Sequence, residues 1–149
     1  MANAGRILVI EDEKDSIYNA RVRWRLQGID VQVAESVSAA INFVGTNEFN
    51  LILVDIRLPK TPEADEISNF AGVEFILDLC SGAYGERNSH TPLMIITNQQ
   101  HSVDEKRLGT LSTFKGVFDK LNEERIIEFV ERFVLGAGNP RESTADPLS

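Results

Sequence analysis

The chain has 149 residues, of which 42% are hydrophobic, a size and composition that suit one compact domain with a full-sized core. Its formal net charge of -8 argues against a surface built to neutralise phosphates, so nucleic acid is not expected as a direct partner. No apolar run approaches the ~20 residues of a membrane span, the first residues lack the layout of a signal peptide, and the single cysteine, Cys80, can form no internal disulfide. Together these features predict a cytoplasmic protein.

Short aliphatic runs alternate with helical patterns along the first half of the chain. In chain order we expect a strand at 7–10, a helix capped by Asp15 or Ser16 and stopped by Gly28, a strand at 29–34, a helix over 37–44 that Gly45 ends, and a strand at 51–54. The last of these strands is apolar at every position, which is typical of a strand buried on both faces. It runs directly into the carboxylate of Asp55.

The second half of the chain repeats the alternation with longer connections. We expect a polar loop at 60–69, a helix over 73–80, a second long loop at 81–91, a strand at 93–96, a poorly patterned helix over 102–111, a strand around 117–118 and a final helix capped by Asn122. Both loops exceed the usual ~2 to 6 residues. On the final helix the apolar arc is wider than one core-facing stripe, so Phe129 and Phe133 predict a surface for a dimer or an output partner.

Five strands alternating with five helices predict a parallel sheet with helices on both faces. Right-handed crossovers make this a single doubly wound α/β sandwich. We place this domain at residues 1–136. Residues 137–149 are rich in Gly, Pro, Ser and Thr, and are expected to form a tail or a linker.

Polar residues stand at the carboxyl ends of four of the predicted strands. They are Glu11 and Asp12 after the first strand, Asp55 after the third, Thr97 after the fourth and Lys120 after the fifth. Because chemistry in open parallel sheets collects at the carboxyl ends of strands, we expect all five to meet at one edge. Each residue alone has an ordinary explanation, such as a surface lysine or a helix-capping acid. Their joint occurrence at strand ends favours a functional site.

The types of these residues indicate the chemistry of the site. Three carboxylates together repel one another unless a cation holds them ionised, and oxygen ligands favour magnesium over zinc. Neither histidine stands at a strand end, so no zinc set can be assembled. Magnesium and the ammonium of Lys120 suit the oxygens of an incoming phosphoryl group, the hydroxyl of Thr97 can donate to one of them, and Asp55 can be the nucleophile.

With these residues in place, the chain resembles a response-regulator receiver domain of two-component signalling, a flavodoxin-like (βα)5 fold. The resemblance covers about residues 5–135, and it is carried by the segments 7–13, 51–59 and 92–97 together with Lys120. By that resemblance Asp55 is the phospho-acceptor, Glu11, Asp12, Asp55 and the backbone carbonyl of Arg57 hold Mg²⁺, and Thr97 and Lys120 contact the phosphoryl group. The implied phosphoryl donor is a histidine kinase or a phosphotransfer protein. The implied activity is self-catalysed phosphotransfer and dephosphorylation, without conventional enzymatic turnover.

The chain departs from the family pattern at three positions. Leu121 follows the lysine where the family usually has proline, Val117 stands where it often has Tyr or Phe, and Gly72 is displaced from its usual place by the polar loop. One rival therefore stays open, a pseudo-receiver that binds partners without being phosphorylated. Two others fit the residues poorly. A phosphatase of the haloacid dehalogenase type needs a second Asp where Arg57 stands, and a dinucleotide-binding protein needs a Gly-rich turn after the first strand.

Overall fold

The computed structural model describes residues 4–13, 15–59, 61, 67–68, 71–98 and 105–136. Five strands form one parallel sheet: β1 (Gly5–Ile10), β2 (Ile29–Ala34), β3 (Leu51–Asp55), β6 (Leu93–Thr97) and β7 (Phe114–Asp119). Their order in the sheet is β2-β1-β3-β6-β7, and neighbouring strands are hydrogen-bonded. The central strands β1, β3 and β6 carry the aliphatic runs, because their side chains are covered on both faces. The predicted parallel α/β fold is confirmed.

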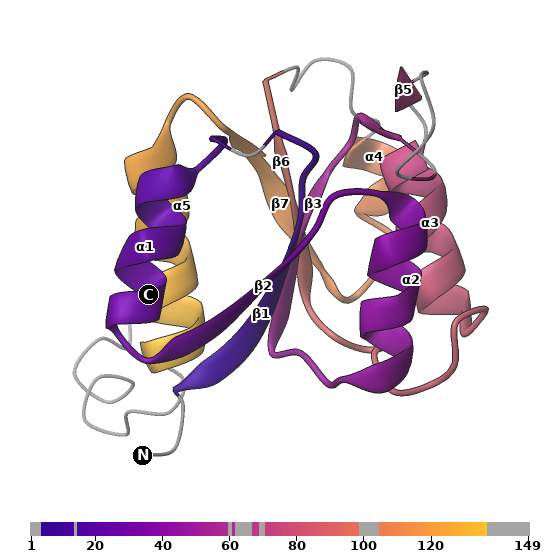
Figure 1. The fold of residues 1–149 in the computed structure, drawn as a ribbon. Coiled ribbons are helices and arrows are strands. Elements are labelled where there is room, and N and C mark those ends of the chain that lie inside the picture. The colour runs from indigo at the N-terminus through magenta and orange to yellow at the C-terminus, as the bar shows by residue number, and fades with distance from the viewer. Residues whose placement is uncertain are drawn as a thin grey trace.

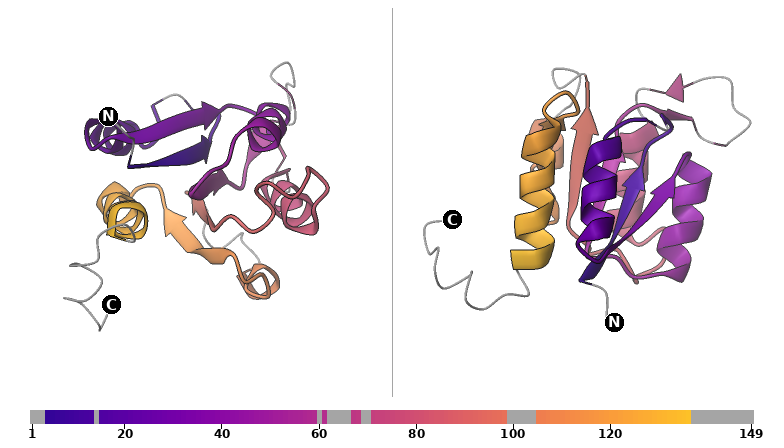
Figure 2. Two further views of the ribbon diagram at one scale, coloured as in Figure 1. Left: turned by 90° about the horizontal axis from the view of Figure 1, so that it is seen from below. Right: turned by 60° about the vertical axis from the view of Figure 1, so that its left-hand side comes forward.

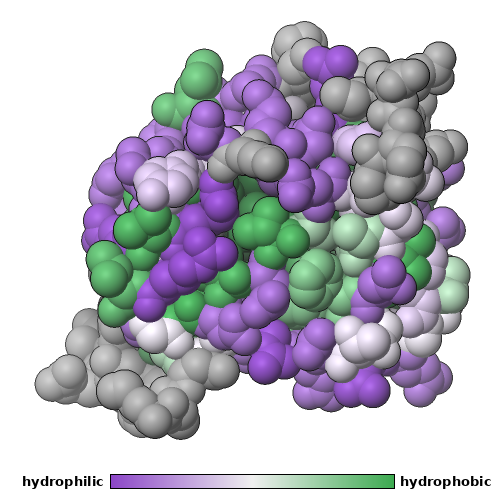
Figure 3. All heavy atoms as spheres, in the orientation of Figure 1, coloured by the Kyte–Doolittle hydropathy of each residue, from purple (hydrophilic) through white to green (hydrophobic). Residues whose placement is uncertain are grey.

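Helices cover both faces of this sheet (Figures 1 and 2). On one face lie α1 (Tyr18–Leu26) and α5 (Glu123–Val130), and on the other lie α2 (Val37–Thr46), α3 (Ala71–Ser81) and α4 (Glu105–Leu108). Successive side chains of a strand point to opposite faces of the sheet and pack into two separate cores. Leu53 packs toward α1 and α5, whereas Val54 packs toward α2 and α3. Figure 3 shows one side of this sandwich, largely hydrophilic, with apolar side chains gathered between α1 and α2. No helix in the described part of the chain is long and apolar enough to cross a membrane.

The start of α1 differs from the expected cap. The helix begins at Tyr18, after Ile17 in a left-handed conformation (φ 45°), and neither Asp15 nor Ser16 caps it. The carboxylate of Glu123, at the beginning of α5, instead accepts a hydrogen bond of 2.9 Å from the backbone N–H of Ala20. A side chain more than a hundred positions away therefore serves the amino end of α1, and no local sequence pattern reveals it.

Other elements also differ from expectation in their extent, such as β7, which is longer than the strand expected around 117–118. The second helix continues one residue beyond Gly45, to Thr46. The segment expected to be a polar loop contains a short strand, β5 (Ile67–Ser68), which pairs antiparallel with β4 (Leu58–Pro59), whereas positions 60, 62–66 and 69–70 lie outside the described residues. In the predicted fourth helix, the described residues form only the turn Glu105–Leu108, which is held by the buried side chain of Leu108.

The C-terminal helix has the amphipathic pattern that its sequence predicts. The side chain of Asn122 caps α5 by accepting from the backbone N–H of Arg125, and a π-helical segment, η2 (Glu131–Leu135), continues it. The half-buried rings of Phe129 and Phe133 stack on each other, and Phe129 also packs against Phe118 of β7 at a centroid distance of 4.9 Å. Much of the wide apolar arc thus covers the edge of the sheet beside β7.

Candidate functional site at the carboxyl edge of the sheet

The parallel sheet brings the predicted polar residues to one edge. Ile10 of β1 pairs with Val54 of β3, so the residues that follow them, Glu11 and Asp55, leave their strands at the same level. On the other side of β3, Thr97 of β6 pairs with Asp119 of β7. The next residue, Lys120, donates its backbone N–H to the carbonyl of Thr97 at 3.0 Å. The sheet register alone therefore places these side chains together.

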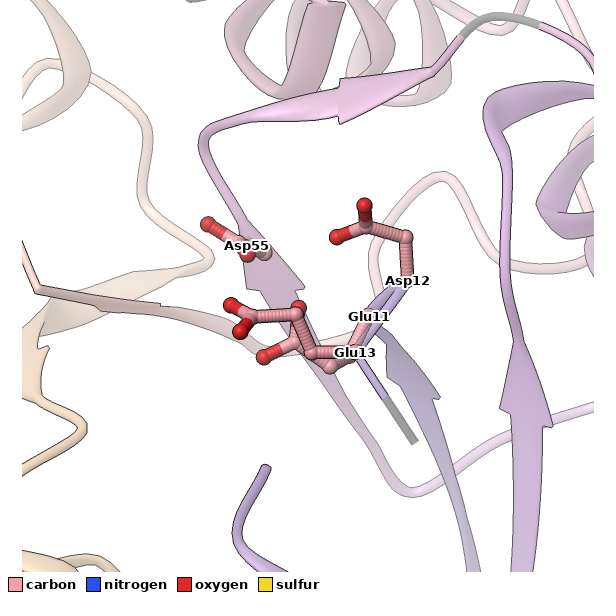
Figure 4. A group of neighbouring side chains, drawn as sticks. All are labelled: Glu11, Asp12, Glu13 and Asp55. Atoms are coloured by element: carbon pink, nitrogen blue, oxygen red, sulfur yellow. The ribbon is translucent and has the colours of Figure 1, made fainter. Parts of the chain in front are cut away.

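Four carboxylates gather at this edge, between the ends of β1 and β3 (Figure 4). Glu11, Asp12, Glu13 and Asp55 each offer an oxygen, and these oxygens all lie within 4.8 Å of one another. Glu11 and Asp55 are buried, Asp12 is half-buried and Glu13 is exposed. Such a group of like charges is unfavourable without a compensating cation.

Lys120 supplies one compensating charge. Its ammonium contacts Oε1 of Glu11 at 2.7 Å and Oδ2 of Asp55 at 3.0 Å, and its side chain is only 6% exposed. Burial alone would lower the pKa of Lys120. The hydrogen bond to Glu11 and the charges of Asp55 and Glu11 outweigh burial and raise that pKa, so the ammonium stays protonated.

The remaining carboxylates repel one another, and either protonation or a second cation relieves that repulsion. Burial, and then the neighbouring Asp55, raise the pKa of Glu11 to about 7, and burial together with the charge of Glu11 raises the pKa of Asp12. The buried Oε2 of Glu11 accepts no hydrogen bond from any described residue. An unpaired buried carboxylate oxygen beside three other carboxylates offers the oxygen ligands that a divalent cation such as Mg²⁺ prefers. The residues present therefore fit a metal site.

An open hollow of about 370 Å³ lies directly over the acids. The carboxylate of Asp55 lines this hollow. Its Oδ1 accepts a hydrogen bond of 3.1 Å from the backbone N–H of Arg57. Thr97 is buried in the wall. The described residues that line the hollow are Asp12, Glu13, Asp55, Arg57, Thr97, Asn98 and Lys120. Its width and polarity leave room for a small anionic group next to Asp55.

Gly72 fixes the backbone behind Asp55. Its N–H donates to the carbonyl of Ile56 at 3.2 Å, and a Cβ placed on Gly72 would overlap the carbonyl oxygen of Asp55 and lie 2.8 Å from Cα of Ile56. Only glycine permits this approach, because real Cβ atoms do not come so close to backbone. The start of α3 thereby braces the segment that carries Asp55, even though the polar segment separates the two in sequence.

The structure brings all the sequence-predicted site residues to this edge. Glu11, Asp12, Asp55, Thr97 and Lys120 converge, and Arg57 borders the same hollow. Sequence reasoning missed Glu13, whose Oε1 lies 3.3 Å from the ammonium of Lys120. The signal was present in the acid run 11–13, but an exposed acid directly after a strand is usually a solvated one. The peptide bond after Lys120 is trans, as are all those of the described residues.

Comparison with known families identifies the chain. The family model of the response regulator receiver domain matches residues 7–131, which is most of its length. This chain is a member of that family. In receiver domains generally the partner is a histidine kinase, and the acidic cluster of this receiver domain is consistent with a phosphorylation site. No curated protein sequence matches the chain.

Solved structures agree with this assignment at the level of the fold. The receiver domain of Francisella response regulator 1452 is 20% identical with a TM-score of 0.66, covering 89% of this chain and 98% of its own. The N-terminal domain of a response regulator/sensory box/GGDEF protein from Carboxydothermus hydrogenoformans is 24% identical with a TM-score of 0.66, covering 90% and 98%. The response regulator TrrA from Thermotoga maritima, solved in complex with Mg²⁺-BeF, is 18% identical with a TM-score of 0.61, covering 89% and 99%.

Proposed function

We propose that this receiver domain accepts a phosphoryl group on Asp55 and changes conformation to control a partner. The observation that carries the proposal is the position of Asp55. It is buried at the end of β3, it faces an open polar hollow, and one of its oxygens contacts the ammonium of Lys120. A carboxylate in this position is accessible to a donor from one side only.

The transfer forms one bond and breaks one. An oxygen of the Asp55 carboxylate provides the electron pair for the new O–P bond, and the bond from phosphorus to the imidazole nitrogen of a phosphohistidine donor breaks, so that the nitrogen keeps its pair. Lys120 and the hydroxyl of Thr97 stabilise the negative charge on the phosphoryl oxygens. The backbone N–H of Arg57 orients the carboxylate. Positioning and charge supply most of the catalysis in such a transfer.

Glu11, Asp12, Asp55 and the backbone carbonyl of Arg57 would hold Mg²⁺. The ion, when bound, neutralises phosphoryl oxygens and lets the acids stay ionised together. The unpaired oxygen of Glu11 and the closeness of the carboxylates support this assignment. The Thermotoga maritima response regulator with the same fold was solved with Mg²⁺-BeF, which makes the same ligand a suitable probe for this chain.

The phosphorylated state would act through the surface beside β7. Val117 faces the core under α4 and has no ring to swing when Thr97 moves, because its single torsion is strongly restricted. The stacked Phe129 and Phe133 lie on the opposite side of β7 and are half-buried. We assign this helix face to a second copy or an output partner. Residues 137–149, the expected tail or linker, lie outside the described residues.

Intact-mass spectrometry tests the proposal. With Mg²⁺ and acetyl phosphate, the wild-type protein should gain the mass of one phosphate, and Asp55→Asn should gain none, because the amide is not a nucleophile. Removal of Mg²⁺ with a chelator should also abolish the gain. A wild-type protein that stays unmodified with acetyl phosphate and with phosphorylated histidine kinases would favour the pseudo-receiver, and equal labelling of Asp55→Asn would refute the choice of residue.

A further inference from the structure

The third carboxylate on Lys120 is not required by the proposed transfer. An ammonium has three N–H donors, and in this structure Lys120 directs them at Glu11, Asp55 and Glu13, at 2.7, 3.0 and 3.3 Å. The first two acceptors are buried. The side chain of Glu13 is 65% exposed, so it holds the ammonium from the solvent side.

Glu13 and Lys120 stand at the boundary of two hollows. The first is the acid hollow over Asp55, and the second, of about 530 Å³, lies between the segment after β1 and the turn before α5. Both hollows are lined by Glu13, Asn98 and Lys120. The ion pair between Glu13 and Lys120 thus lies where the two hollows meet, at the rim of the hollow over Asp55.

Phosphorylation requires one of the three contacts to give way. The phosphoryl oxygens need a donor from Lys120, and all three of its N–H groups are already used. The contact to Glu13 is the longest, and water can replace it on the exposed carboxylate at little cost. Release of Glu11 would leave a buried carboxylate without its cation, which is far more costly.

We propose that Glu13 is a positioning residue that holds Lys120 at the rim of the site and slows phosphorylation by small anionic donors. This inference rests on the proposed function. With acetyl phosphate, an Asp55 oxygen supplies the pair of the new O–P bond, the bond from phosphorus to the acetyl oxygen breaks, and acetate leaves with that pair. Glu13 opposes this step in two ways. Its negative charge repels the anionic acetyl phosphate, and it accepts a hydrogen bond from one of the N–H groups of Lys120 that must reach the phosphoryl group.

Rates of phosphorylation by acetyl phosphate test the role of Glu13. Glu13→Gln should react about threefold to tenfold faster than the wild type at low ionic strength, and the difference should shrink in high salt because surface charges are screened there. Asp15→Asn is the matched control. Asp15 is exposed, lines only the second hollow and carries the same charge, but its carboxylate is not among the three that Lys120 contacts.

A second measurement follows Lys120 itself in the metal-free protein. The side-chain N–H signal of Lys120, observed by heteronuclear NMR, should shift and exchange faster with water in Glu13→Gln and stay unchanged in Asp15→Asn. If the wild type is phosphorylated but Glu13→Gln reacts at the same rate, this inference alone is overturned. The same holds if Asp15→Asn is accelerated as much as Glu13→Gln. A wild type that takes no label overturns the proposed function and this inference with it.

Discussion

The amino and carboxyl edges of the sheet differ in how completely two of their buried polar side chains, Asn88 and Glu11, are hydrogen-bonded. At the amino edge, Asn88 is 1% exposed, and its side chain accepts from the backbone N–H of Phe49 and the hydroxyl of Thr91 while it donates to the carbonyls of Val44 and Asn47. At the carboxyl edge, the equally buried Glu11 keeps one oxygen without a described partner. Buried polar groups are normally paired, and an unpaired carboxylate oxygen that lies among three other carboxylates is consistent with a cation site at this edge.

The hydrogen bonds of Asn88 also fix the long connection at the amino edge. The loop 82–92 joins α3 to β6 at the amino edge, and Asn88 ties it to the end of α2 and to the segment that leads into β3. A long loop fixed at its centre by four hydrogen bonds behaves as part of the scaffold. The amino edge therefore contributes stability, whereas the clustered carboxylates of the carboxyl edge cost stability.

The largest expected effect comes from the amino edge. Asn88→Ala removes all four hydrogen bonds and leaves one buried carbonyl, one part-buried carbonyl and one buried N–H unpaired, which should cost about 2 to 4 kcal/mol of unfolding free energy. Urea unfolding at constant Mg²⁺ measures it. Asn19→Ala, an exposed change on α1, should stay within about 0.5 kcal/mol of the wild type. Equal stability of the two variants would remove the contrast between the edges.

A glycine at the carboxyl edge should have the next largest effect. Gly72→Ala forces a methyl group against the backbone of Asp55 and Ile56, and such overpacking costs about 1 to 3 kcal/mol. The displaced backbone should also slow phosphorylation of Asp55. Gly45→Ala is the control, because a Cβ at Gly45 meets nothing within 4 Å. Alanine in place of this helical glycine should raise the unfolding free energy by about 0.5 to 1 kcal/mol. A Gly72→Ala protein as stable as the wild type would show that α3 does not brace this segment.

The smallest expected effect is a gain in stability when the charge of Asp12 is removed. The folded state raises the pKa of Asp12, so its ionised form costs stability at neutral pH, and this cost disappears below the ordinary aspartate pKa of about 4. Because the side chain is partly exposed, Asp12→Asn should stabilise the metal-free protein by only about 0.5 kcal/mol at pH 7. Wild-type protein should gain stability on addition of Mg²⁺, and the variant should gain much less. Thermal unfolding with and without Mg²⁺ measures both changes in stability. A metal-free Asp12→Asn protein less stable than the wild type would show that Asp12 is not repelled by its neighbours.

The strands and the central site residues could be predicted because their signals are local. A buried aliphatic run that ends in Asp55 or Thr97 shows both the strand and the polar group at its end, and the parallel topology then brings the ends together. The family assignment that follows from these segments is confirmed by the match over residues 7–131. The roles of the individual site residues stay predictions.

The features that could not be predicted depend on contacts between distant residues. Glu13 is one of three consecutive acids, and only the folded position of Lys120 distinguishes it from a solvated side chain. Asn88 lies in a loop whose composition shows no sign of its four hydrogen bonds. The expected cap of α1 was wrong for the same reason, because Asp15 and Ser16 are suitable residue types and the actual partner belongs to α5.

The hydrogen bond from Ala20 to Glu123 has a consequence for the order in which the chain folds. It joins two residues 103 positions apart, and Arg23 adds an ion pair of 2.7 Å with Glu131 between the same helices. A helix of nine residues such as α1 is marginal alone, and here its first turn also follows Ile17 in an unfavourable backbone conformation. During synthesis on the ribosome, α1 therefore waits for the last element of the domain before its amino end is complete. The earliest helix of the chain is then among the last to be secured.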